Sequence, residues 1–228
     1  MQIIGKHLIE AAQKKHSTWK GSLGSWVRIV EGVNPPWNNF PAVRRTRKDA
    51  DAVGDCVVFN IKHNDARLIT YVNYEMRTVT VLAVLTHNNT TKEGGKMPAI
   101  AERLPAKYLV KAEAPKIIAS REQHEAYIQR LLELQRKAHR SAEEAETAQL
   151  LVVLIADYEA KQFTIEKASG VEVLRELMDA NGLRQKDLAD DLGGESIVSW
   201  ILKEKRQLNR QQMEKLSHRF QVSPAVFF

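Results

Sequence analysis

The amino-acid sequence predicts an α+β domain, built from two helices and an antiparallel sheet, followed by an all-α domain that contains a helix-turn-helix. Two helical apolar stripes precede three β-like runs in the first 92 residues, and short helices around a glycine turn fill the last third. The charged residues are also distributed unevenly along the chain. Residues 1–96 carry 14 Lys and Arg against 8 Asp and Glu, whereas residues 97–228 carry 20 of each. The net charge of +6 therefore lies wholly in the first part, which indicates that the two domains have different partners.

The composition of the 228 residues indicates a globular protein, because 43% of them are hydrophobic. The single cysteine, Cys56, can form neither an internal disulfide nor a cysteine-rich zinc site, which indicates a reducing compartment. The longest apolar run covers residues 150–156, far short of the roughly 20 residues that cross a bilayer. With no signal-peptide pattern at the N-terminus, we expect a cytoplasmic protein without a membrane partner. A helix formed by residues 150–156 would be apolar on every side, which predicts that these residues are deeply buried.

The first domain reads as helices followed by strands. Apolar residues recur at helical spacing over residues 4–16 and 19–33, and a proline pair ends the second helix. Three runs rich in Val, Ile, Tyr and Thr follow at residues 56–61, 67–74 and 78–86. Polar breaks between these runs suit hairpin turns, so we expect an antiparallel meander.

A glycine pair and several prolines indicate a linker after the first domain. Met97 begins a stretch that resembles an internal translation start, as if two reading frames were joined. Ser120 and Ser141 each stand three residues before Gln or Glu, the capping-box pattern, and so predict the starts of two helices. The expected organisation is a first domain at 1–92, a linker at 93–116, a helical region at 117–170 and a helix-turn-helix domain at 171–228.

The last third carries the most specific pattern. Residues 185–193 read Gln-Lys-Asp-Leu-Ala-Asp-Asp-Leu-Gly, and residues 196–202 read Ser-Ile-Val-Ser-Trp-Ile-Leu. Ala189 is small enough for two helices to cross closely, and Gly193 permits the turn between them. The second helix can then enter the major groove of DNA. The alternative is a helical pair used only for dimerisation or for binding a partner protein.

This pattern resembles the lambda-repressor-like (Xre-type) helix-turn-helix and, more closely, the HigA-type antitoxins, over about residues 115–228. The resemblance implies that Ser199, Trp200 and Lys203 face bases. It implies contacts with phosphates, or a position where the helix enters the groove, for Gln185, Ser196, Lys205 and Arg206. Because this part of the chain has no net charge, we expect DNA binding to depend on local cations, with Lys186 on the same face as Lys203, Lys205 and Arg206. Glu195 and Ile197 stand where many relatives carry basic residues, and a carboxylate that faces phosphates weakens binding.

The densest run of charge in the first domain is a basic cluster before the strands. The RNA-binding candidates are this cluster and one lysine in a turn: Arg44, Arg45, Arg47, Lys48 and Lys62. The cluster could hold a polyanion or form a solvated loop. His87 closes the last strand, where an imidazole could act as a general acid or base or could be structural.

Residues 1–92 resemble the HigB-type toxins of the RelE superfamily, with matching segments at 57–61 and 64–69 and at Leu85-Thr-His87. The resemblance implies a RelE-like fold that enters the ribosomal A site and cleaves mRNA without a metal or another cofactor. It assigns the catalytic roles to Asn64, Arg67 and His87. The chain departs from the family at Leu82, where an arginine is usual, and at Thr90, where a tyrosine is usual. Because each missing charge-stabilising group can cost about 10²–10³ in rate, the sequence leaves enzyme activity open.

The order of the two resemblances reproduces the gene order of HigB–HigA operons, so we expect a fused toxin–antitoxin protein. The expected function is that of a homodimeric repressor of its own promoter, whose antitoxin part neutralises the attached toxin-like domain in cis or in trans. The alternative is a latent ribosome-dependent mRNA endonuclease that is released when the linker is cleaved. An engineered fusion of two native chains is a third reading that the sequence leaves open.

Overall fold

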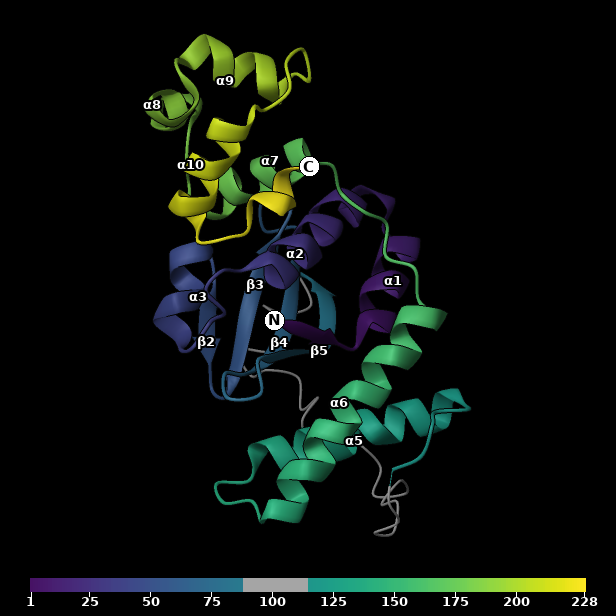
Figure 1. The fold of residues 1–228 in the computed structure, drawn as a ribbon. Coiled ribbons are helices and arrows are strands. Elements are labelled where there is room, and N and C mark those ends of the chain that lie inside the picture. Colours follow the sequence, from purple (N-terminus) through teal and green to yellow (C-terminus); the bar gives the residue numbers. More distant parts are fainter. Residues whose placement is uncertain (88–114) are drawn as a thin grey trace.

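The computed structural model describes residues 1–87 and 115–228, and it places a five-stranded sheet between two helical regions (Figure 1). The strands are β1 (Gln2–Ile4), β2 (Asp51–Val53), β3 (Cys56–Ile61), β4 (Ala66–Asn73) and β5 (Thr78–Thr86). They lie in the order β1-β5-β4-β3-β2. An α+β region followed by an all-α region confirms the predicted fold class.

The sheet is mixed rather than purely antiparallel, which corrects the sequence prediction. β1 pairs with β5 in parallel, whereas the other three pairs are antiparallel. Ile4 was expected in the first helix, but Ile3 and Ile4 are fully buried in different apolar clusters. Neighbouring residues reach opposite faces only when the chain is extended. Gly5, with φ of 86°, then turns the chain into α1, and a Cβ there would lie 2.7 Å from the Val81 carbonyl oxygen.

Three helices and the sheet of the first domain share one apolar core. The helices are α1 (Lys6–Lys15), α2 (Lys20–Gly32) and α3 (Phe40–Thr46), with the short 3-10 turn η1 at Ser17–Trp19. The third helix was not expected. Its signal is local, because the Asn39 side chain caps the first turn and Pro41 stands at its start. Only seven residues long, α3 lacks the repeated apolar stripe that reveals longer helices.

The hairpin of α5 (Arg121–Arg136) and α6 (Ala142–Gln162) begins at the two predicted serine caps. Its apolar side chains pack against Ile4 of β1 and partly buried residues of β4 and β5. The prediction that residues 150–156 are deeply buried is wrong. Leu150 is 42% exposed and Val153 is 63% exposed, because α6 is covered on one side only. Inward positions follow helical spacing and include Leu151 and Ile155.

A bundle of short helices ends the chain. Its elements are α7 (Gly170–Ala180), η3 (Gln185–Leu188), α8 (Ala189–Leu192), α9 (Glu195–Leu202), α10 (Arg210–Phe220) and η4 (Pro224–Phe227). Gly193 closes α8 with φ of 93°, and Gly194 leads into α9, so the predicted turn joins two short helices. None of the described helices is long and apolar enough to cross a membrane.

The first domain and the terminal bundle share a single core. Leu174 and Leu177 of α7 belong to the same buried cluster as Trp26 and Phe59. Arg28 on α2 also donates hydrogen bonds to the carbonyl oxygen of Ala168, just before α7, and to those of Ala225 and Phe228 at the end of the chain. The bundle therefore packs as an integral layer against the first domain.

The contact between α2 and residues 163–169 requires a glycine at position 24. A Cβ at Gly24 would lie 2.4 Å from the Glu166 carbonyl oxygen and 3.1 Å from the Ala168 nitrogen, both backbone atoms. A Cβ at Gly21, one turn earlier, would meet only the flexible carboxylate of Glu172, at 2.7 Å.

We therefore expect Gly24→Ala to lower the free energy of unfolding by about 1–3 kcal/mol, because a backbone segment must move to admit the methyl group. Gly21→Ala is the matched control in the same helix. It should change stability by no more than about 1 kcal/mol, since its neighbour can rotate away and alanine favours helix. Guanidinium chloride denaturation of both variants measures the difference, and equal stabilities would contradict the close approach.

Candidate functional sites

Arg67 and His87 form the centre of the candidate catalytic site. Arg67 lies on β4 opposite Leu85 of β5, and its Nη2 is 3.3 Å from Nε2 of His87. The backbone N–H of His87 donates to the carbonyl oxygen of Asp65 at 3.1 Å, which fixes the end of β5. Both side chains are half-buried. In such a pair the guanidinium can stabilise negative charge on a phosphate, and the imidazole can transfer a proton.

Asn64 stands on the exposed turn between β3 and β4. Lys62, His63 and Asn64 all have positive φ angles, of 49°, 51° and 77°. This turn contacts α7, because the backbone N–H of His63 donates to Asp179 Oδ2 at 3.1 Å and the His63 ring bonds the same carboxylate. The terminal bundle thus holds the turn that carries a candidate catalytic residue.

Leu82 occupies an apolar environment. Its side chain packs against two buried apolar clusters, one of which contains Val58 and Ile69 and the other Tyr127 and Leu131. The position where relatives usually carry an arginine therefore contributes packing and not charge. Thr90, the second departure, lies outside the described residues.

The predicted basic cluster divides into surface and buried residues. Arg44, Arg45 and Lys48 are exposed, and Lys62 is half-buried and lies 3.5 Å from Asp65. Arg47 has only 1% of its side chain exposed. Its guanidinium pairs with Asp49 at 2.8 Å and Glu176 at 2.9 Å, and it also donates to the Asn60 carbonyl oxygen at 2.8 Å.

The expectation that Arg47 contacts RNA does not fit this burial, because its donors are directed into the protein. Burial opposes the charge of Arg47, but Asp49 and Glu176 outweigh that effect and raise the pKa of the guanidinium. Burial raises the pKa of the Glu176 carboxyl, and the adjacent Arg47 only partly offsets it. Arg47 is thus a buried cation that joins the first domain to α7.

α9 lies at one end of the molecule, away from the sheet (Figure 1), and the residues expected at DNA lie on η3, on α9 and in the loop that follows α9. Trp200 is 50% exposed, although large aromatic side chains are usually buried. The exposed residues are Lys186, Ser196, Lys203, Lys205 and Arg206, and the half-buried ones are Gln185 and Ser199. The structure therefore brings these residues together around one short helix. Glu195 is exposed at the first turn of α9.

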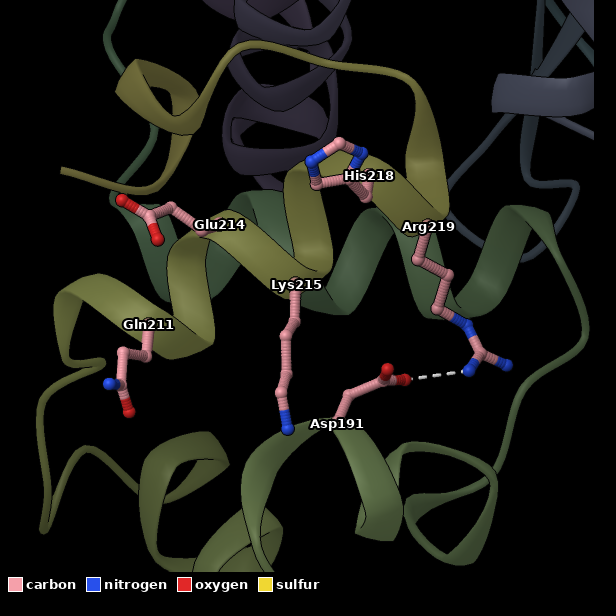
Figure 2. A pocket seen from close by; sticks show the side chains of 6 residues that line it. All are labelled: Asp191, Gln211, Glu214, Lys215, His218 and Arg219. Atoms are coloured by element: carbon pink, nitrogen blue, oxygen red, sulfur yellow. Dashed lines mark hydrogen bonds and ion pairs between the residues drawn. The ribbon is translucent and has the colours of Figure 1, made fainter.

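A polar pocket between α8 and α10 was not expected from the sequence (Figure 2). Its lining residues are Asp191, Gln211, Glu214, Lys215, His218 and Arg219. Arg219 pairs with Asp191 at 2.6 Å across the pocket, and charges of both signs line it. Exposed charges on an amphipathic helix carry no sequence signal of their own, since most such residues are simply solvated.

Comparisons with known proteins identify two resemblances. Residues 19–92 match the model of the HigB toxin family, described as the RelE-like toxic component of a toxin-antitoxin system. Over 58 residues the chain is 45% identical to proteins named Antitoxin HigA from Escherichia coli strain K12, Escherichia coli O6:H1 and Shigella flexneri. That match covers 25% of this chain and 41% of each relative, so the chain spans about two fifths of the length of these relatives.

Arg45 is exposed and Arg47 is buried, so substitutions at these two positions should affect stability differently. Arg47→Met should lower the free energy of unfolding by about 3–5 kcal/mol, because it leaves buried carboxylates without a counter-charge. Arg45→Met, the surface control, should change stability by less than about 0.5 kcal/mol. Since burial raises the pKa of Glu176, the loss in Arg47→Met should shrink as the pH falls and that carboxyl binds a proton. Urea denaturation across a pH series measures this; equal effects of the two substitutions would show that Arg47 is not a buried ion pair in solution.

Proposed function

We propose that this chain, which matches the HigB toxin-family model over residues 19–92 and resembles Antitoxin HigA over 58 residues, is a toxin–antitoxin protein that acts as a DNA-binding repressor and keeps its own toxin-like domain docked. One observation carries the proposal. The α9 surface is exposed, whereas the opposite side of the bundle, through α7, packs into the core of the toxin-like domain. DNA binding and docking therefore use different sides of the same bundle and can occur together.

The composition of the α9 surface supports DNA binding. An exposed aromatic ring such as Trp200 can contact thymine methyl groups in the major groove. Lys203, Lys205 and Arg206 follow at the end of the helix, where cations can neutralise phosphates. A two-fold dimer would place two such helices about one DNA turn, roughly 34 Å, apart on a palindromic operator.

The contacts of α7 support neutralisation. Asp179 holds the turn that carries Asn64, and Glu176 compensates Arg47 from the same helix. Because catalytic contacts often form only when substrate binds, fixing this turn would oppose productive binding. Neutralisation in this form needs no antitoxin from another chain.

A second candidate function, a latent mRNA endonuclease, is favoured by the contact between Arg67 and His87. In that reaction the ribose 2′-oxygen would attack the adjacent phosphorus while the bond to the 5′-oxygen of the next nucleotide breaks. A base takes the 2′ proton and an acid protonates the leaving oxygen. Arg67 would stabilise the phosphorane and His87 would transfer a proton, while Leu82 supplies no charge. We place the repressor first, because exposed cations follow α9, whereas Leu82 leaves the catalytic site without a charge at that position.

The repressor proposal predicts a specific pattern of binding defects at the native upstream region. Trp200→Ala should weaken specific binding by about 10–100-fold, because a base contact is worth about 1–3 kcal/mol. Lys205→Ala should weaken binding to all sequences and lower the salt slope by about one. Lys161→Ala is the control, because Lys161 is an exposed residue of α6, and it should leave DNA binding unchanged. Fluorescence anisotropy over a salt series tests this, and full retention of specific binding in Trp200→Ala would contradict the assignment of α9.

Docking predicts that cutting the linker leaves the two parts together. A protease site placed within residues 93–116 should give two fragments that co-elute in size-exclusion chromatography, because the shared core does not depend on a covalent link. The same cut in Arg47→Met should allow separation, whereas Arg45→Met should behave like the parent. If the parent fragments separate on cleavage alone, linker cleavage becomes sufficient for release and the second candidate function is favoured.

A further inference from the structure

Three side chains from three helices meet where the α5–α6 hairpin packs on the first domain. They are His7 of α1, His124 of α5 and Glu159 of α6, and their candidate ligand atoms all lie within 4.8 Å of one another. His124 Nε2 is 2.9 Å from Glu159 Oε1, and His7 Nδ1 is 3.8 Å from the same oxygen. The backbone N–H of Gly5 also donates to Oε1, at 2.8 Å.

The cluster is buried and incompletely hydrogen-bonded. Glu159 and His124 are 0% exposed. Within the described residues, three of its buried polar atoms make no hydrogen bond: His7 Nδ1, His124 Nδ1 and Glu159 Oε2. Native proteins pair nearly all buried polar atoms, so three such atoms at one point indicate a further binding partner. Tyr158 and Phe163 form an aromatic wall, with ring centres 4.9 and 5.7 Å from that of His124.

The donor atoms at this point suit a cation, because one carboxyl group is enclosed with two imidazoles. Two imidazole nitrogens and one carboxylate oxygen make a donor set that zinc uses in proteins, with a water as fourth ligand.

We propose that His7, His124 and Glu159 bind one Zn²⁺ ion that fastens the α5–α6 hairpin to α1 of the toxin-like domain. Bond lengths of about 2.0–2.1 Å require ligand atoms roughly 3.3 Å apart. The His7–Glu159 pair, at 3.8 Å, would therefore close slightly around the ion, and the His124–Glu159 pair, at 2.9 Å, would open slightly. His7 has 16% of its side chain exposed, which gives the ion a route from solvent. The Gly5 N–H would orient the carboxylate from outside the donor set.

This site is distinct from the Arg67–His87 pair and from α9, so its role is structural. Each of the three ligands comes from a different helix, and zinc binding to the folded state would stabilise the junction by mass action. If the cluster is only a hydrogen-bonded pair of His124 and Glu159 beside His7, zinc should not bind there with one-to-one stoichiometry.

The test uses the full chain without an affinity tag, stripped with a chelator, reloaded with ZnCl₂ and passed through gel filtration. We expect one zinc per chain by elemental analysis and a rise in the thermal midpoint. Cobalt(II) in place of zinc should give the visible absorption bands of a tetrahedral site. His7→Ala should weaken zinc binding more than about 100-fold, since loss even of an outer partner costs about 10–100-fold.

His139→Ala is the matched control, because this histidine is exposed in the loop between α5 and α6. It should retain one zinc per chain with unchanged affinity in competition with a chromophoric chelator. His7 is the decisive position because it is half-buried on a surface helix, and circular dichroism verifies that the variant is folded. Folded parent protein that retains no zinc, or equal zinc binding in His7→Ala and His139→Ala, would overturn the proposal.

Discussion

The burial of Arg47 constrains how the two halves of this chain are arranged. Removing a guanidinium from water is costly unless opposite charge and hydrogen bonds replace the lost solvation. Asp49 supplies part of that replacement from the first domain, but Glu176 arrives from α7, 129 residues further along the chain. A first domain without α7 would keep Asp49 beside Arg47 but would lose the second counter-charge. The ion pair therefore makes the correct position of α7 a condition for burying this residue.

The other contacts across the junction build on that position. Gly24 allows residues 163–169 to pass directly over α2, and Arg28 on the same helix donates hydrogen bonds to carbonyl oxygens at the end of the chain. Docking also buries a continuous apolar core, so packing contacts hold the two halves together in addition to the chain connection between them.

Local signals in the sequence predicted much of the fold, and long-range contacts account for what it missed. The serine caps of α5 and α6 and the three later strands depend on neighbouring residues, and each was found. The three-residue β1 is stabilised by pairing with β5, which no local pattern reports. Residues 150–156 have the composition of a buried helix, yet nothing in that pattern shows how many elements cover it.

The candidate sites also differ in how far local sequence patterns could predict them. The residues around α9 lie close together in the sequence, so their gathering followed from one short pattern. Arg47 looked like its exposed neighbours because its partner Glu176 is remote, and charge density alone cannot separate the two environments. His7, His124 and Glu159 lie on three separate helices and share no motif. Only the packing of those helices brings their side chains together.

These contacts also change what the net charge of the first domain means. Arg47 is buried and neutralised internally, so this cation is not available to a polyanion. Arg44, Arg45 and Lys48 remain at the surface. The net-neutral bundle, in contrast, concentrates Lys203, Lys205 and Arg206 after one exposed helix. Local placement of charge, rather than the sum over a domain, therefore favours α9 as the nucleic-acid surface that stays accessible while the two halves are docked.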